Sequence, residues 1–196
     1  MAVAATAAAH AHGHAHNRLQ LNRVGLWLFF FSESIVFGLL LTSRFFLMGV
    51  DREHVDQQLG LIITIILLLS SVTAFTAETA IEQDRRRLAS WMLLATILLG
   101  VIFTVGVGFE WSIAEFNRKE VFGTVFFTMT GIHATHVVTG VIMLFLVWVQ
   151  LKRGKFSSRD HFAVSGTVMY WHFVDVVWVF YYPALYLIGN VVTPGQ

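Results

Sequence analysis

The sequence has 196 residues, of which 56% are hydrophobic and 13% are charged, and its formal net charge is +1. A soluble domain carries about 25% charged residues, so this composition favours a membrane protein. The small net charge gives no electrostatic basis for a nucleic-acid partner. Cysteine is absent, which excludes disulfides, thiolate metal sites and cysteine nucleophiles.

The first 17 residues form a low-complexity tail rich in alanine, with four histidines at every second position. Such a segment cannot bury enough apolar surface to fold alone, so residues 1–17 are predicted to be a disordered tail. Neutral imidazole is a good metal ligand, which leaves a weak transition-metal site at His10, His12, His14 and His16 as the alternative. No signal peptide is predicted, and residues 18–196 are predicted to form one membrane domain.

Five apolar stretches follow the tail, each long enough to cross a bilayer, which requires roughly 20 helical residues. Lipid offers the backbone no hydrogen-bond partner, and the alternating pattern of a barrel is missing, so the stretches are predicted to be helices. The predicted spans are 24–47, 59–80, 88–109, 122–151 and 162–189. The predicted fold is therefore all-α, a polytopic membrane bundle of five transmembrane helices.

Lysine and arginine predict the orientation of this bundle. With five spans, nine of these residues fall on the side of the N-terminus: Arg18, Arg23, Arg85, Arg86, Arg87, Lys152, Arg153, Lys155 and Arg159. The other side has only Arg44, Arg52, Arg118 and Lys119. Because the side richer in lysine and arginine is cytoplasmic, we expect a cytoplasmic N-terminus and a periplasmic C-terminus.

Glu33 lies in the middle of the first predicted span. At 1.5 Å per residue, its depth is about 15 Å, where a charged carboxylate costs about 3 kcal/mol. We therefore expect Glu33 to face the protein interior or to be neutral. The residues alone leave two roles open, a proton-handling group or subunit contact, and an acid that is simply hydrogen bonded within the bundle.

The fourth and fifth predicted spans carry the other deep ionisable residues. His133 and His136 are three apart, so they share a helix face and could bind a metal or, with His172, a haem. The alternative is that these histidines satisfy polar groups across helix contacts. His172 and Asp175 are also three apart, which predicts a hydrogen-bonded pair that serves either as a proton relay or as a fastener between helices.

Other charged residues lie near the predicted membrane surfaces. Glu78 and Glu110 fall near the ends of the second and third spans, where water is accessible, and are interpreted as interface residues. Arg85, Arg86 and Arg87 form a predicted topology anchor that contacts lipid phosphate. No phosphate-binding loop and no water-exposed domain large enough for a substrate pocket is evident in the sequence.

Four segments resemble subunit III of the haem-copper respiratory oxidases. Residues 23–33 (RVGLWLFFFSE) are similar to the family's membrane-entry segment, and residues 69–73 (LSSVT) to its Ser-Ser-x-Thr segment. Residues 131–140 match the pattern Gly-x-His-x-x-His-Val-x-x-Gly, and residues 170–178 (YWHFVDVVW) match its most characteristic stretch. The segments occur in the family's order, on four of the five spans. The larger family form has seven helices, and this chain resembles the five-helix bacterial form.

The resemblance implies an accessory subunit of a proton-pumping terminal oxidase that reduces dioxygen to water in aerobic respiration. It implies a chain that carries no cofactor of its own and is not itself catalytic, while haem and copper belong to partner subunits. Subunit I would be the main partner, with subunits II and IV and bound phospholipid as further neighbours. The location implied is the bacterial cytoplasmic membrane, with a cytochrome c or a quinol as the electron donor of the complex.

The resemblance also implies roles for the polar residues. Glu33 would be the family's buried carboxylate near lipid and subunit I. Its site would contribute, together with the arginine segment 85–87, to lipid contact, proton uptake and protection of the active site. A structural polar network inside the membrane would then be formed by His133, His136, His172, Asp175, Glu78 and Glu110.

Three other functions remain as alternatives. A subunit III paralogue of a nitric oxide reductase would share the same motifs. A membrane redox protein would use His133, His136 and His172 to bind haem or metal. A proton-coupled transporter would use Glu33 and Asp175, but it is disfavoured because no span is broken mid-membrane by proline and no internal repeat is evident.

Overall fold

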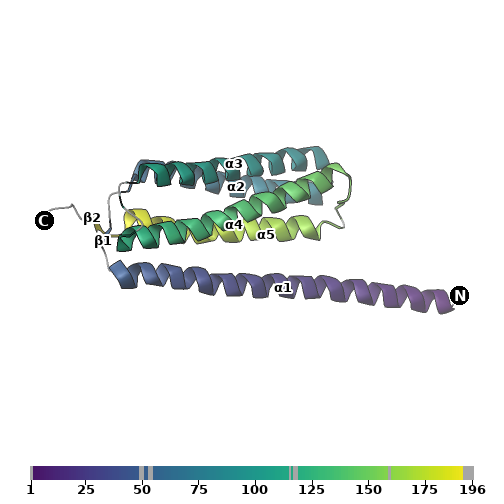
Figure 1. Cartoon of the computed structure of the whole chain (residues 1–196). Coiled ribbons are helices and arrows are strands. Elements are labelled where there is room, and N and C mark those ends of the chain that lie inside the picture. Colours follow the sequence, from purple (N-terminus) through teal and green to yellow (C-terminus); the bar gives the residue numbers. More distant parts are fainter. Residues whose placement is uncertain are drawn as a thin grey trace. The chain divides into compact units, whose positions relative to one another are not determined.

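The computed structural model describes residues 2–48, 51–52, 55–114, 116, 119–158 and 160–191 (Figure 1). Side chains are described from residue 20, except at 51–52 and 190–191. Its helices are α1 (Ala2–Met48), α2 (Gln57–Glu82), α3 (Arg86–Ile113), α4 (Val121–Lys152) and α5 (Phe162–Tyr182), followed by the π-helical turn η1 (Pro183–Leu187). Within these described residues, five helices are long and apolar enough to span a membrane. The predicted all-α fold with five spans is confirmed.

The boundaries of the spans agree with the hydropathy pattern to within about one helix turn at most ends. The largest differences are at α1, which begins at Ala2, at α3, which continues to Ile113, and at α5, whose regular turns end at Tyr182. Pro183 follows directly and begins η1. A proline lacks the amide hydrogen that the preceding turn would use, so the last predicted turns of this span become π-helical.

A short ladder adds to the helical fold at the C-terminal side. Strands β1 (Asp51–Arg52) and β2 (Asn190–Val191) pair in parallel, with Asp51 opposite Asn190. Each strand has two residues, too few for hydropathy to reveal. The ladder joins the connection between α1 and α2 to the chain after η1.

The contacts divide the chain into two compact units, Met1–Val36 and Phe37–Gln196. This division falls inside α1, not at residue 18. In the first unit, residues 2–17 are helical, whereas the sequence predicts a disordered tail there; the high helix propensity of alanine favours a helix. Disorder of this tail in solution stays a prediction. The side chains of His10, His12, His14 and His16 lie outside the described part, as does the metal site suggested for them.

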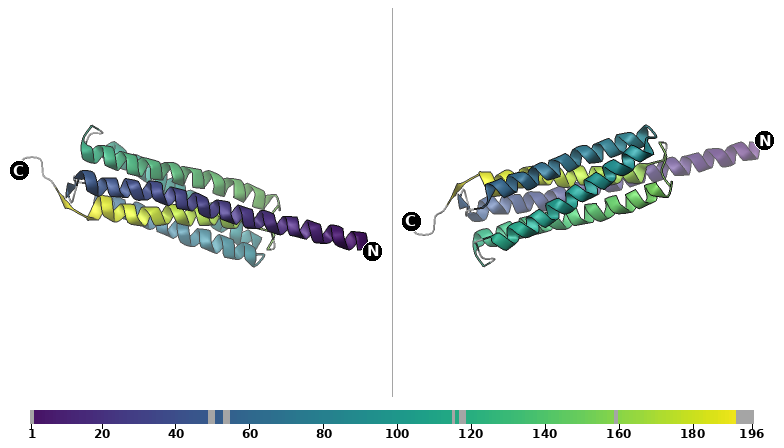
Figure 2. Two further views of the ribbon diagram at one scale, coloured as in Figure 1. Left: turned by 90° about the horizontal axis from the view of Figure 1, so that it is seen from below. Right: turned by 90° about the horizontal axis from the view of Figure 1, so that it is seen from above.

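Four helices of the second unit form a closed ring. α2 packs against α3 and α5, and α4 packs against the same two helices (Figure 2). The connections from α2 to α3 and from α4 to α5 are short, so neighbours run antiparallel. The first of them closes α2 with bonds from the amides of Asp84 and Arg85 to the carbonyls of Ile81 and Ala80. Asp84 has a φ of 57°, the left-handed conformation that ends many helices.

Trp171 of α5 fills the centre of this ring and is fully buried. A Cβ atom added at Gly100 of α3 would lie 2.6 Å from its ring, and one at Gly140 of α4 would lie 2.8 Å away. Small residues allow membrane helices to approach closely, so these two glycines create the space that the indole occupies. Many large apolar side chains on the outside of the ring are exposed, as expected where lipid replaces water.

Candidate functional site

His133 lies in the core of the ring and is fully buried. Its Nε2 donates a 3.1 Å hydrogen bond to the carbonyl of Val174 on α5. The ring is in contact with Trp178, at 4.7 Å between centroids, and with Phe103, at 5.7 Å. Nδ1 has no hydrogen-bond partner among the described residues. His133 therefore acts as a polar fastener between α4 and α5 within an aromatic cluster.

His136 contacts different neighbours, although it shares a helix face with His133. Its Nδ1 donates a 2.8 Å bond to the carbonyl of Ile132, and its ring lies 4.9 Å from the ring of Phe37. Each of the two histidines thus donates a hydrogen bond from one ring nitrogen to a backbone carbonyl. Within the described part of the chain, no three histidine, aspartate or glutamate side chains are placed to hold a metal ion.

His172 and Asp175, the predicted pair, do not bond to each other. Nδ1 of His172 shares a 2.6 Å hydrogen bond with the hydroxyl of Ser71 on α2. The carboxylate of Asp175 is buried, and neither of its oxygens has a hydrogen bond of good geometry among the described residues. Ser71 also interacts with Asp175, and Glu78 acts electrostatically on His172. These polar groups therefore meet at the contact between α2 and α5.

Glu110 is buried, unlike the water-accessible position predicted for it. Its Oε2 accepts a 2.6 Å hydrogen bond from the hydroxyl of Tyr186 in η1, and 3% of the residue is exposed. The amide of Gln57 donates 2.9 Å to the carbonyl of Tyr186. The burial of Glu110 has a structural cause, because η1 folds over this end of α3 and covers the carboxylate.

Arg44 is a buried cation that the hydropathy pattern does not single out. Its Nε donates 3.2 Å to the carbonyl of Ala184 and its Nη2 donates 3.4 Å to that of Ile188. It is fully buried. The irregular π-turn leaves carbonyls without regular helical partners, and Arg44 satisfies two of them. The sequence feature that could have indicated this role is the position of an arginine inside an apolar span.

Four tryptophan indoles join helices by donating to hydroxyl groups, a pattern that the sequence analysis missed. The pairs, with N···O distances of 2.9 to 3.1 Å, are Trp178–Thr64, Trp171–Ser70, Trp111–Thr130 and Trp148–Ser90. Thr64, Ser70 and Thr130 also donate to a carbonyl of their own helix. In these four pairs the indole hydrogen, which must be paired in lipid, therefore has an acceptor on a neighbouring helix.

The arginine segment lies at the start of α3, and Glu33 belongs to the first unit. Arg85, Arg86 and Arg87 are exposed at the start of α3, and Nε of Arg86 is 3.3 Å from Oδ1 of Asp84. Glu33 lies on α1 in the first unit, between Ser32 and Ser34, whose hydroxyls bond to carbonyls of their own helix. The roles predicted for these residues stay predictions.

An open groove of about 280 Å³ lies between α3 and α4, lined by Trp111, Thr124, Phe127 and Thr128. None of these side chains can act as an acid or base near neutral pH. The groove therefore offers no group for proton transfer, and the polar residues described above are committed mainly to joining helices.

The cytochrome c oxidase subunit III family model matches residues 4–190. The chain belongs to that family. It is similar to the cytochrome c oxidase subunit 3 of Spodoptera frugiperda, with 37% identity over 68% of this chain and 91% of the relative. It is also similar to the probable quinol oxidase subunit 3 of Staphylococcus aureus strain USA300, with 34% identity over 88% of this chain and 91% of the relative. The resemblance found in the four sequence segments is confirmed.

As a subunit III, the chain has its family segments on the elements that the structure joins. The segment 131–140 supplies His133 and Gly140 on α4, and the segment 170–178 supplies Trp171 and His172 on α5. His133 bonds to Val174 of the second segment, Gly140 lies against Trp171, and Trp171 and His172 bond to serines of α2. In this subunit III fold, the motif residues therefore hold the helix ring together.

Proposed function

We propose that this chain is a non-catalytic accessory subunit of a proton-pumping haem-copper terminal oxidase. In this function it packs against subunit I, the chain that reduces dioxygen to water, and lies beside subunits II and IV. Haem and copper belong to the partner subunits. The membrane is the bacterial cytoplasmic membrane, with the N-terminus inside.

One observation carries the proposal beyond family membership. Three deep ionisable groups on α3, α4 and α5 bond to a neighbouring helix or turn, whereas His136 bonds within its own helix and the Asp175 carboxylate has no hydrogen bond of good geometry among the described residues. His133 reaches Val174, His172 reaches Ser71, and Glu110 is bonded to Tyr186. An enzyme or a transporter needs such groups free at a site where substrate binds, whereas a scaffold subunit needs them for rigidity.

The proposal assigns the surface of the chain to lipid and to subunit I. Exposed apolar side chains on every helix supply area for both. Glu33 would lie near lipid and subunit I, and Arg85, Arg86 and Arg87 would attract anionic headgroups at the inner surface. Through these contacts the subunit would support proton uptake and protect the active site of subunit I during turnover.

The test compares the purified oxidase with and without this chain. We expect both forms to reduce dioxygen at first, and the form without the chain to lose activity faster during turnover. The chain expressed alone should show no haem absorbance and should contain neither iron nor copper at stoichiometric levels. Stoichiometric haem or metal in the isolated chain would overturn the proposal, as would co-purification with a nitric oxide reductase in place of an oxidase.

A further inference from the structure

Basic side chains gather at one end of the helix ring. Three arginines precede or begin α3, and Lys152 ends α4, followed by Arg153 and Lys155. Because α3 and α4 are antiparallel neighbours, the start of one lies beside the end of the other. A Cβ added at Gly154 would lie 4.0 Å from Nη1 of Arg86, which brings the two connections together. We call this region, residues 85–87 and 152–155, the basic end.

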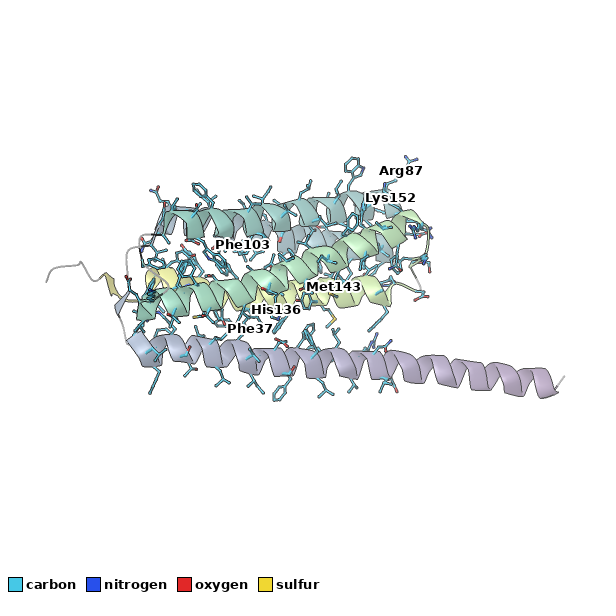
Figure 3. All side chains as sticks on the ribbon, viewed as in Figure 1. Phe37, Arg87, Phe103, His136, Met143 and Lys152 are labelled. Atoms are coloured by element: carbon cyan, nitrogen blue, oxygen red, sulfur yellow. The ribbon has the colours of Figure 1, made fainter. Side chains whose placement is uncertain are left out.

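A hydrogen bond fixes the seam between α3 and α4 just below the basic end. Nε1 of Trp148 donates 3.1 Å to Oγ of Ser90. Arg87 is three residues before Ser90, and Lys152 is four residues after Trp148. Residues three and four apart stand above one another on a helix, so both cations lie one turn beyond this bond. Figure 3 shows Arg87 and Lys152 at the same end of their helices.

These two cations are available to an anion. Arg86 is paired with Asp84, and Glu82 lies 3.8 Å from His161. Among the described residues, no carboxylate pairs with Arg87 or Lys152, and both side chains are exposed. Nζ of Lys152 lies 5.7 Å from the centroid of the Trp148 ring, which orients the ammonium along the seam. The first turn of α3 has no side-chain cap, so its free amides add positive potential.

The surface below the cations is apolar and aromatic. Trp91, one turn after Arg87, is 68% exposed. Phe145 is half exposed and stacks on Trp148, with 6.0 Å between centroids. Tryptophans are enriched where membrane meets water. Cations above and aromatic rings below match the two parts of a phospholipid, a charged headgroup and an acyl chain.

We propose that Arg87 and Lys152 bind the phosphate of an anionic phospholipid, whose acyl chain lies along the α3–α4 seam beside Trp91 and Phe145. This inference rests on the proposed function, to which it adds the class of lipid and the place where that lipid binds. A guanidinium binds phosphate oxygens in pairs and an ammonium adds a compact charge. An acidic protein surface is the competing occupant, which the exposed rings below the charges disfavour.

The test uses the delipidated full chain in detergent, titrated with phosphatidylglycerol or phosphatidylcholine and followed by native mass spectrometry. Replacing Arg87→Gln together with Lys152→Gln should weaken phosphatidylglycerol binding roughly tenfold or more, since each cation near an anionic surface contributes about fivefold. Phosphatidylcholine binding should not change. The charge-conserving pair Arg87→Lys with Lys152→Arg should bind phosphatidylglycerol as the unmodified chain does.

A matched control removes two charges elsewhere on the same predicted membrane side, with Arg18→Gln and Arg23→Gln. It should leave phosphatidylglycerol affinity unchanged. Equal losses in both double variants would overturn the inference, because net charge alone would then explain them. Competition by inorganic phosphate at the lipid's own concentration would overturn it as well, since the acyl chain would contribute nothing.

Co-purification with the oxidase separates this inference from the proposed function. If the Arg87→Gln, Lys152→Gln chain keeps its phosphatidylglycerol affinity but no longer co-purifies with the other subunits, the basic end is a protein contact. The lipid site would then be wrong, while the accessory function would stand. If no form of the chain assembles with an oxidase, the proposed function fails whatever lipid binds.

Discussion

The hydroxyl of Tyr186 donates a 2.6 Å hydrogen bond to Oε2 of Glu110, and both residues are buried. The bond joins the π-turn after α5 to the last turns of α3. Glu110 has no second partner for Oε1 among the described residues. Among the described residues, the hydrogen bond from the Tyr186 hydroxyl is therefore the one on which the Glu110 carboxyl depends.

Replacing Tyr186→Phe should destabilise the chain by about 1–3 kcal/mol, the cost of leaving a buried polar group without its bond. Thermal unfolding in detergent micelles would measure the loss. The control is Glu110→Gln, which keeps an acceptor for the phenol and should cost less. If Tyr186→Phe is as stable as the unmodified chain, the bond contributes nothing to the fold.

The two glycines around Trp171 give a second prediction. Gly140→Ala should destabilise the chain by roughly 1–3 kcal/mol, the usual cost of overpacking a core, because the added methyl would meet the fully buried indole at 2.8 Å. Gly100→Ala should behave in the same way. Thermal unfolding of the chain without its partner subunits would measure the loss of stability in both variants.

Gly108→Ala is the matched control for these variants, since it adds the same methyl group to α3 where nothing lies within 4 Å. It should leave stability unchanged or raise it slightly, because alanine has the higher helix propensity. A loss at Gly108 equal to that at Gly140 would show that the indole contact is not the cause.

Substitution of His133 distinguishes a structural role of this histidine from a metal-binding role. His133→Ala should leave the haem and copper content of the assembled oxidase unchanged but should lower its thermal stability by about 2–4 kcal/mol, the range for emptying a packed core site. Metal analysis and unfolding of the same preparation give both values. Loss of haem or copper from the His133→Ala preparation would instead favour the alternative in which this chain is a membrane redox protein.

The sequence predicts the spans well because each is set by a local property, the length of an apolar run. It does not predict which groups pair across helices, because that depends on how each helix is rotated about its axis. His172 is three residues from Asp175 yet bonds to Ser71, 101 residues away in sequence. The burial of Arg44 and Glu110 was missed for a related reason, since η1 covers both only after Pro183 interrupts α5.

Glu33 provides the last prediction, which rests on its depth in α1 and on its place in the family segment 23–33. Glu33→Ala should leave the assembly of the oxidase largely intact, because other residues supply the hydrogen bonds that join α2 and α4 to α5. The variant complex should contain less lipid and should lose activity severalfold faster during turnover. The decay of oxygen consumption and the phospholipid content of the purified complex are the measurements. Ser34→Ala is the neighbouring control, since the Ser34 hydroxyl bonds to the Phe30 carbonyl of its own helix, at 2.7 Å. Wild-type lifetime and lipid content in Glu33→Ala would remove the role assigned to this carboxylate, and equal effects in both variants would trace the loss to α1 itself.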